Sequence, residues 1–295
     1  MCGRFASARK RIELLEEFGV QRDRVDADLE PDYNVAPTKK VYAVLTRHAS
    51  HGDDAPAEPA APAELASQAE PAAPAERQLR VVRWGLVPYW AKDPAIGSRM
   101  INARAETIAE KPAFRRAFTR RRCLLPADGF YEWQQVTDGD KKRKQPYYIY
   151  RADGGVLAFA GLYELWRDPS VPEDHESGWL WTTTIITTDA QDEVGRIHDR
   201  MPMVIESAAW PDWLDPDNSD AADVRRLLVP AMSGGLTSRP VSTAVNNVRN
   251  NGPQLTDLLV QDGPASASPS SLPRSGPSGA HPPDGAPAGS GETLF

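Results

Sequence analysis

The sequence predicts an α+β fold, a single β-rich domain with a curved or barrel-like mixed sheet flanked by short helices. Two observations lead to this class. Short segments rich in aromatic and β-branched residues, which are typical of strands, recur along the chain. Segments with helical patterns lie between some of them, but strands and helices do not alternate regularly, as they would in a doubly wound fold. The sequence also has no G-x-G-x-x-G motif and no P-loop.

The first predicted helix covers residues 8–18, ARKRIELLEEF. Ser7 can cap its N-terminus, and Gly19 follows as a stop signal. The residues expected on one face of this helix are Ile12, Leu15 and Phe18. Further short helices are expected over residues 111–119, 207–215 and 221–228.

Strands are predicted wherever aromatic and β-branched residues cluster. The segment TDGDKKRKQ, residues 137–145, is expected to be a hairpin loop between two of them. The predicted strands cover residues 41–48, 79–87, 121–127, 129–135, 145–151, 156–166 and 179–188.

Two segments have compositions that do not support a packed core. Residues 50–77 are rich in Ala, Pro and Glu, and we expect a disordered loop insertion there. Residues 263–295 are rich in Pro, Ser, Gly and Ala, and we expect a disordered tail whose apolar end, GETLF, could dock a partner such as a replication factor. The folded domain is therefore expected to span residues 1–262.

The net charge of −7 is unevenly distributed. Residues 50–76 hold six carboxylates and no Lys or Arg, while the tail holds two carboxylates and one arginine. The remainder is neutral, with 33 acidic and 33 basic residues, and keeps basic clusters at 115–122 and 141–144. A local basic face that binds nucleic acid is therefore compatible with the acidic total.

No apolar run approaches the roughly 18 residues that a membrane helix needs, and the N-terminus shows no apolar signal-peptide core. The two cysteines, Cys2 and Cys123, are too few for a disulfide scaffold or a four-cysteine metal site. These features favour a cytoplasmic protein whose thiols stay reduced. No metal-binding spacing such as HExxH or CxxC occurs, so no metal and no cofactor is expected.

Polar residues interrupt apolar, strand-like text at four places. Glu132 lies between Tyr131 and Trp133; burial would raise its pKa and suit it to acid–base catalysis. Because strand side chains alternate, Glu132 could instead face water while its neighbours point inward. The other polar positions are Asn34 with Pro37, Asn102 with Arg104 and Glu106, and His198 with Asp199 and Arg200.

His198 offers a group that titrates near neutral pH, or a structural histidine bonded to Asp199 or to a backbone carbonyl. Asn102 and Arg104 would face the same side of an extended segment. An amide and a guanidinium together suit a carbonyl or phosphate oxygen, but they could equally hold a loop in place.

Cys2 stands directly behind Met1 in MCGRFASARK. Removal of Met1 would place a free α-amine beside the thiol on one residue. Chain termini are often weakly constrained, so position 2 alone does not separate a reactive terminus from a residue without a role.

Taken together, eight segments resemble the SOS-response-associated peptidase (SRAP) family, the abasic-site processing proteins. They occur in the family's order and extend nearly to Asp262; the insertion and the tail interrupt none of them. The segments are MCGRF, YNVAPT, RWGLVPYW, INARAET, RRCLLPADGFYEW, PYYIY, IHDRMPMVI and VSTAVNNVRNNGPQL.

The resemblance implies a compact β-rich α+β domain with the N-terminal cysteine in a DNA-binding cleft. It implies covalent capture of abasic sites in single-stranded DNA through a thiazolidine at Cys2, which protects the lesion during the DNA damage response. Weak lyase activity and autocatalytic release of Met1 or of the crosslink would be compatible with the family's peptidase name. The catalytic residues carried over are Cys2, Asn102, Glu132 and His198, and the DNA-binding residues are Arg4, Asn34, Pro37, Trp84, Trp90 and Arg104.

Two alternatives remain on the sequence alone. An N-terminal-nucleophile hydrolase would use Cys2, Glu132 and His198 but leaves the arginines unexplained. A single-strand-binding module would use Trp84, Trp90 and Tyr131 as stacking platforms but leaves Cys2 without a role. The expected partner is single-stranded DNA that contains abasic sites, bound by a monomer that associates with the nucleoid and with no membrane.

Overall fold

The computed structural model describes residues 2–48, 74–138, 141–172, 178–229 and 235–259. They belong to a compact unit that ends at Leu259. The predicted tail and almost all of the predicted insertion lie outside the described residues. The end of the predicted insertion is corrected, because a strand already begins at Ala75.

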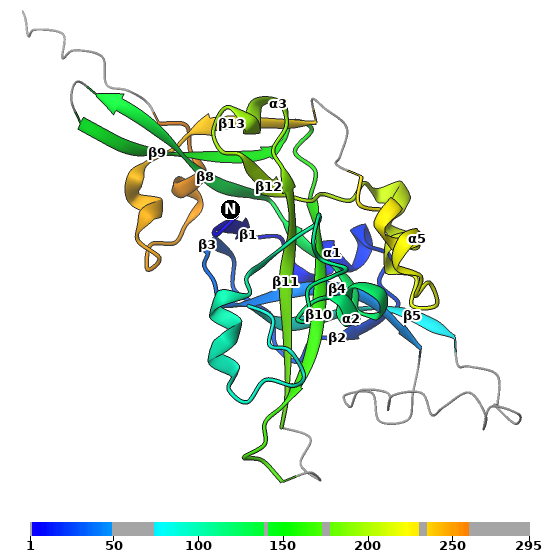
Figure 1. Ribbon diagram of the computed structural model, residues 1–295. Coiled ribbons are helices and arrows are strands. Elements are labelled where there is room, and N and C mark those ends of the chain that lie inside the picture. The colour runs from blue at the N-terminus through cyan, green and yellow to red at the C-terminus, as the bar shows by residue number, and fades with distance from the viewer. Residues whose placement is uncertain (1, 49–73, 139–140, 173–177, 230–234, 260–295) are drawn as a thin grey trace, which may run out of the picture. The chain divides into compact units, whose positions relative to one another are not determined.

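Within the described residues, five strands close into a barrel (Figure 1). Four neighbouring pairs are antiparallel, and a parallel contact between β11 and β5 closes the ring, with Thr182 opposite Arg83. The curved mixed sheet that the sequence predicts is therefore confirmed. The five strands are β4 (Lys40–His48), β5 (Ala75–Trp84), β7 (Arg122–Ala127), β10 (Leu157–Arg167) and β11 (Trp179–Asp189).

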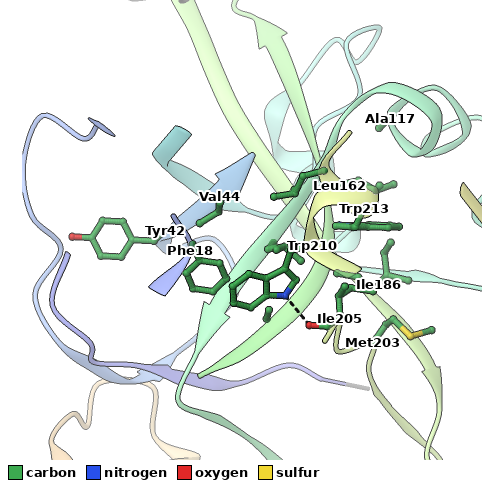
Figure 2. Packing of buried hydrophobic residues seen from close by; sticks show 14 of the residues in the cluster. Phe18, Tyr42, Val44, Ala117, Leu162, Ile186, Met203, Ile205, Trp210 and Trp213 are labelled. Atoms are coloured by element: carbon green, nitrogen blue, oxygen red, sulfur yellow. Dashed lines mark hydrogen bonds between the residues drawn. The ribbon is translucent and has the colours of Figure 1, made fainter. Parts of the chain in front are cut away.

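The barrel strands are apolar on both faces because each face packs against a core. Inside the barrel, Trp84, Phe159 and Ile185 belong to one buried cluster. Outside it, helices cover the sheet. The rings of Phe18 and Trp210, which lie against each other in Figure 2, are stacked with their centroids 4.4 Å apart. Burial on both faces explains why these strands read as continuous apolar runs rather than as alternating patterns.

A second sheet has the order β13-β9-β8-β1-β3. Its long hairpin corrects the predicted loop at 137–145, because Thr137 pairs with Lys142 and Gln135 with Lys144. Charged side chains do not interrupt the ladder, since backbone groups make the bonds while the side chains stand off the sheet. The strands are β1 (Phe5–Ser7), β3 (Asp32–Val35), β8 (Gly129–Asp138), β9 (Lys141–Arg151) and β13 (Leu236–Pro240).

The first helix, α1 (Arg11–Glu17), is shorter than predicted. Ser7 belongs to β1 and caps nothing; instead, the Glu13 carboxylate accepts a hydrogen bond from the Lys10 backbone at 3.3 Å. Leu14 and Phe18 form the buried face, whereas Ile12 is 57% exposed. Gly19 ends the helix as predicted, with a φ of 57° that favours glycine.

The remaining elements are short. Among the described residues, no helix is long and apolar enough to cross a membrane. These elements are β2 (Arg22–Arg24), β6 (Asn102–Arg104), β12 (Arg200–Pro202), α2 (Arg115–Arg120), α3 (Asp192–Gly195), α4 (Trp210–Leu214), α5 (Ala221–Arg226) and the 3-10 helices η2 (Pro94–Arg99), η4 (Ser207–Ala209), η5 (Thr243–Asn246) and η6 (Pro253–Thr256).

Candidate active site

Cys2 lies immediately before β1, at the junction of the barrel core and the second sheet. It is fully buried and packs in the same cluster as Trp84 and Phe130. Its carbonyl oxygen accepts a hydrogen bond from Asn102 Nδ2 at 2.8 Å. Burial is the largest cause that raises the pKa of the Cys2 thiol, so the thiol is protonated at neutral pH. Two of the predicted catalytic residues are thus in direct contact.

Glu132 on β8 is the second buried acid–base group. Only 2% of it is exposed, and burial raises its pKa from an ordinary value of 4.5 to about 7. Its charge is the second cause that raises the pKa of the Cys2 thiol, which places the two groups within electrostatic reach. Because Glu132 itself is buried, the alternative in which its side chain faces water does not hold. Its neighbour Tyr131 is also fully buried. Both faces of β8 are covered at this point.

His198 follows α3, and 29% of its side chain is exposed. Its Nδ1 accepts a hydrogen bond from the Arg200 backbone at 3.0 Å and lies 2.8 Å from Asp199 Oδ1. The two contacts require different protonation states. Burial lowers the pKa of His198 below 6.5, which favours the neutral ring with its proton on Nε2. The exposed Asp199 carboxylate forms an ion pair with His198 only when Nδ1 also carries a proton and the ring is positively charged.

Glu132 and His198 line one open pocket of about 400 Å³. Its other walls are Trp133, Lys144 and Asn246, and Trp133 Nε1 donates to Asn246 Oδ1 at 2.7 Å. The sequence predicts no individual role for these three wall residues. Trp133 and Asn246 lie in segments that resemble the family, and Lys144 ends the basic cluster at 141–144. These segments could be recognised in the sequence, but nothing in it indicated that the three residues line one pocket.

The short strand β6 carries Asn102 and Arg104 and pairs in parallel with β11. Ala103 between them is buried, so alternation directs Asn102 and Arg104 to the opposite face. The Asn102 Oδ1 atom is buried and has no hydrogen-bond partner among the described residues. Arg104 is exposed.

Arg4 and Asn34 connect β1 and β3 to the segment that follows β13. Arg4 Nη1 donates to Asn34 Oδ1 at 2.7 Å and to the Val245 carbonyl at 2.8 Å. Asn34 is fully buried and donates to three carbonyls in residues 245–250. In this conformation Asn34 is buried and holds residues 245–250 in place, and its part in DNA binding stays a prediction.

The two predicted tryptophans have different positions. Trp84 is fully buried, packs edge-on against Phe5 at 5.1 Å and donates Nε1 to the Ile101 carbonyl at 2.9 Å. It belongs to the core in this conformation, and its part in shaping the DNA stays a prediction. Trp90 is 50% exposed and lines a second pocket together with η2. Pro37 is partly exposed in the turn after β3.

Arg200 anchors the strand β12 behind His198. Its guanidinium binds the Glu106 carboxylate with two bonds of 2.8 and 3.0 Å, contacts Asp189, and donates to the Thr187 carbonyl at 2.7 Å. This network fixes the backbone that donates to His198. Within the described residues, no three His, Cys, Asp or Glu side chains gather as a metal site would require.

A model of the SOS response associated peptidase (SRAP) family matches residues 1–248. The chain belongs to this family.

Individual relatives resemble the chain over most of its length. It is 35% identical over 257 residues to the abasic site processing protein YoqW of Bacillus subtilis, an alignment that covers 87% of this chain and 99% of the relative. It is 30% identical over 302 residues to the abasic site processing protein HMCES of Xenopus tropicalis, covering 90% and 81%. A crystal structure of a Bacteroides thetaiotaomicron protein matches with a TM-score of 0.65 and 25% identity, covering 88% of this chain and all of that one.

Proposed function

We propose that this protein processes abasic sites by capturing them covalently in single-stranded DNA through Cys2. The observation that carries the proposal is that two groups suited to this chemistry lie beside Cys2, one through a hydrogen bond and one through its charge. Asn102 holds the Cys2 carbonyl, and Glu132, whose pKa is raised to about 7, lies within electrostatic reach of the thiol. Relatives over most of the chain carry the name of abasic site processing proteins.

The first step requires a free α-amine on Cys2, so the bond between Met1 and Cys2 must be hydrolysed beforehand. An abasic deoxyribose is in equilibrium with a ring-opened aldehyde. The α-amine, with an ordinary pKa of roughly 7.7–8.0, adds to the aldehyde carbon, and loss of water leaves an imine.

Ring closure then uses the thiol of the same residue. The sulfur bonds to the imine carbon and the thiol proton passes to the nitrogen, which gives a five-membered thiazolidine. Both nucleophiles belong to one residue, so the second addition is intramolecular and gains from proximity. The protonated state of the buried thiol fits this step, because the proton it loses is the one the nitrogen needs.

Glu132 and His198 serve as proton carriers. A carboxyl whose pKa is about 7 can both accept and donate a proton near neutral pH, as addition and dehydration require. His198, neutral with its proton on Nε2, can donate a hydrogen bond to the sugar oxygen during ring opening, and protonates that oxygen only after the ring has taken up a second proton. Asn102 orients Cys2 through its carbonyl.

DNA contacts come from the exposed groups around this site. Arg104 is exposed two residues beyond Asn102 and supplies a cation for a phosphate. Trp90 and Pro37 are the exposed candidates for shaping the strand beside the lesion. Arg4 lies 5.8 Å from the centre of the Trp133 ring and supports the pocket wall, in addition to any phosphate contact.

Two rival functions make different predictions. A simple binding module that stacks bases on Trp84, Trp90 and Tyr131 keeps only Trp90 as an exposed platform, because Trp84 and Tyr131 are fully buried, and it gives Cys2 no role. An N-terminal-nucleophile hydrolase would use the same cysteine, and the family name contains peptidase. Such an activity could release Met1 or the crosslink, and an imine would also permit weak strand cleavage by β-elimination.

The test is a denaturing gel after incubation with a single-stranded oligonucleotide that carries one abasic site. We expect a heat-stable shifted band that is absent in Cys2→Ala and in samples with an undamaged oligonucleotide. Cys123→Ala is the matched control, because Cys123 is also a buried free thiol. It packs in the barrel, where its sulfur is hydrogen-bonded to the Thr183 hydroxyl. A band that survives in Cys2→Ala, or active protein that retains Met1 by intact mass, would refute the thiazolidine.

A further inference from the structure

The outer half of the β8–β9 hairpin is a separate feature of the second sheet. Among the described residues, β1 pairs with β8 only at Gly129 and Phe130, and β13 pairs with β9 only from Tyr147 onward. Residues 132–138 and 141–145 therefore extend as a two-stranded arm, which Figure 1 shows projecting beyond β1 and β13.

The β9 strand of this arm carries four consecutive cations: Lys141, Lys142, Arg143 and Lys144, all of them exposed. Their backbone partners on β8 are Asp138, Thr137, Val136 and Gln135, so Lys142, Arg143 and Lys144 pair with uncharged residues. Adjacent like charges do not stabilise an exposed strand. In a chain of net charge −7, such a run indicates a surface that meets a polyanion.

The arm begins at the active-site pocket. Lys144, Trp133 and Glu132 line that pocket, and the other cations continue outward along the same strand. Side chains two residues apart on a strand lie on one side, roughly 6–7 Å from each other, a spacing comparable to that of successive phosphates in an extended DNA strand. Lys142 and Lys144 have this relation.

We propose that the β8–β9 arm binds the sugar–phosphate backbone of the DNA strand whose lesion occupies the pocket lined by Glu132 and His198, on one side of the lesion only. This inference rests on the proposed function for the identity of the strand. The contact is electrostatic and independent of base sequence, because lysines meet phosphates rather than base edges. The arm thus adds affinity and sets the polarity with which the strand crosses the pocket.

The test measures equilibrium binding of single-stranded oligonucleotides that carry a tetrahydrofuran abasic analogue, which has no aldehyde and cannot be captured. The variant is Lys142→Gln/Lys144→Gln, the two arm lysines that lie on one side of β9. Each lost phosphate contact makes the slope of log K against log salt less steep by about 0.7, so we expect a change of about 1.4. The affinity advantage of the wild type then shrinks about sevenfold between 50 and 200 mM salt.

Two controls keep charge and position apart. Lys142→Arg/Lys144→Arg retains the charge and should keep the wild-type slope. Arg225→Gln/Arg226→Gln removes two exposed charges from α5, which lies apart from the hairpin, and should also keep it (Figure 1). With the analogue near either end of the oligonucleotide, the arm variant should lose affinity only when the long flank extends to one side.

An unchanged slope in the arm variant would overturn the inference, and would leave the lysines as protection of an exposed strand against aggregation. An equal change in the α5 variant would overturn it as well, since the effect would then reflect net charge. Failure of the proposed function is recognised separately: the wild-type protein would bind the analogue yet form no covalent band with a native abasic site.

Discussion

Replacing Glu132 by glutamine should make the protein more stable at alkaline pH while nearly abolishing capture. The side chain is 2% exposed, and burial raises its pKa from 4.5 to about 7. A carboxyl whose pKa is raised in the folded state favours folding below the unfolded value. That stability is lost as pH rises through the folded value. Glutamine has nearly the same shape and no charge, so it does not pass through this transition.

The magnitude follows from the two pKa values. A difference of one pH unit corresponds to about 1.36 kcal/mol, so the gap between 4.5 and about 7 amounts to about 3 kcal/mol. Between pH 4.5 and pH 8.5 the stability of Glu132→Gln should therefore rise by about 3 kcal/mol relative to the wild type. For a domain of this size that corresponds to roughly 6–12 °C in Tm.

The assay is urea unfolding of both proteins at the two pH values, combined with the rate of covalent capture at pH 7. Other titrating groups are common to both proteins and cancel in the difference. Capture should fall by about 10²–10⁴-fold, the usual contribution of a general acid–base group, with little loss of DNA affinity.

Glu164→Gln is the matched control, because Glu164 is equally buried but pairs with Arg121 away from the pocket. It should lose stability and keep capture, since it leaves the Arg121 guanidinium without its anion. If Glu132→Gln instead showed the same stability difference from the wild type at both pH values, the raised pKa would be refuted. Equal losses of capture and DNA affinity would make Glu132 a structural residue.

Three further variants test the surroundings of Cys2. Asn102→Ala removes the donor to the Cys2 carbonyl and should slow capture on the order of 10- to 100-fold in single-turnover assays, with DNA affinity maintained. Asn34→Ala removes the only described donor to the Asn250 carbonyl and one acceptor of Arg4 Nη1, whereas the Val245 and Asn247 carbonyls each keep another donor. Stability should fall by at least about 2 kcal/mol in urea unfolding. A smaller loss would show that water replaces the amide. Glu106→Gln weakens the Arg200 network. Because the hydrogen bond from Arg200 lowers the pKa of Glu106, the loss of stability relative to the wild type should be largest above the ordinary glutamate pKa and should shrink at lower pH. A loss that grew as the pH fell would contradict the pairing.

Features that depend on local pattern could be predicted from the sequence. The barrel strands follow from runs of β-branched and aromatic residues, and Gly19 ends the first helix as expected, because backbone preference acts within a few residues. The resemblance of eight segments pointed to the family and to Cys2. Even so, Ser7 was predicted to cap a helix, whereas it pairs in β1 with a strand distant in sequence.

What lies on each face of a strand was decided by tertiary structure alone. The alternation of strand side chains left open that Glu132 faces water while Tyr131 points inward, yet both side chains are buried. Trp84 and Trp90 belong to one sequence segment, but barrel closure encloses the first and leaves the second 50% exposed. The free energy of a side chain depends on what covers it, and covering elements come from remote parts of the chain. Sequence therefore determined which groups can react, and the fold determined which of them meet.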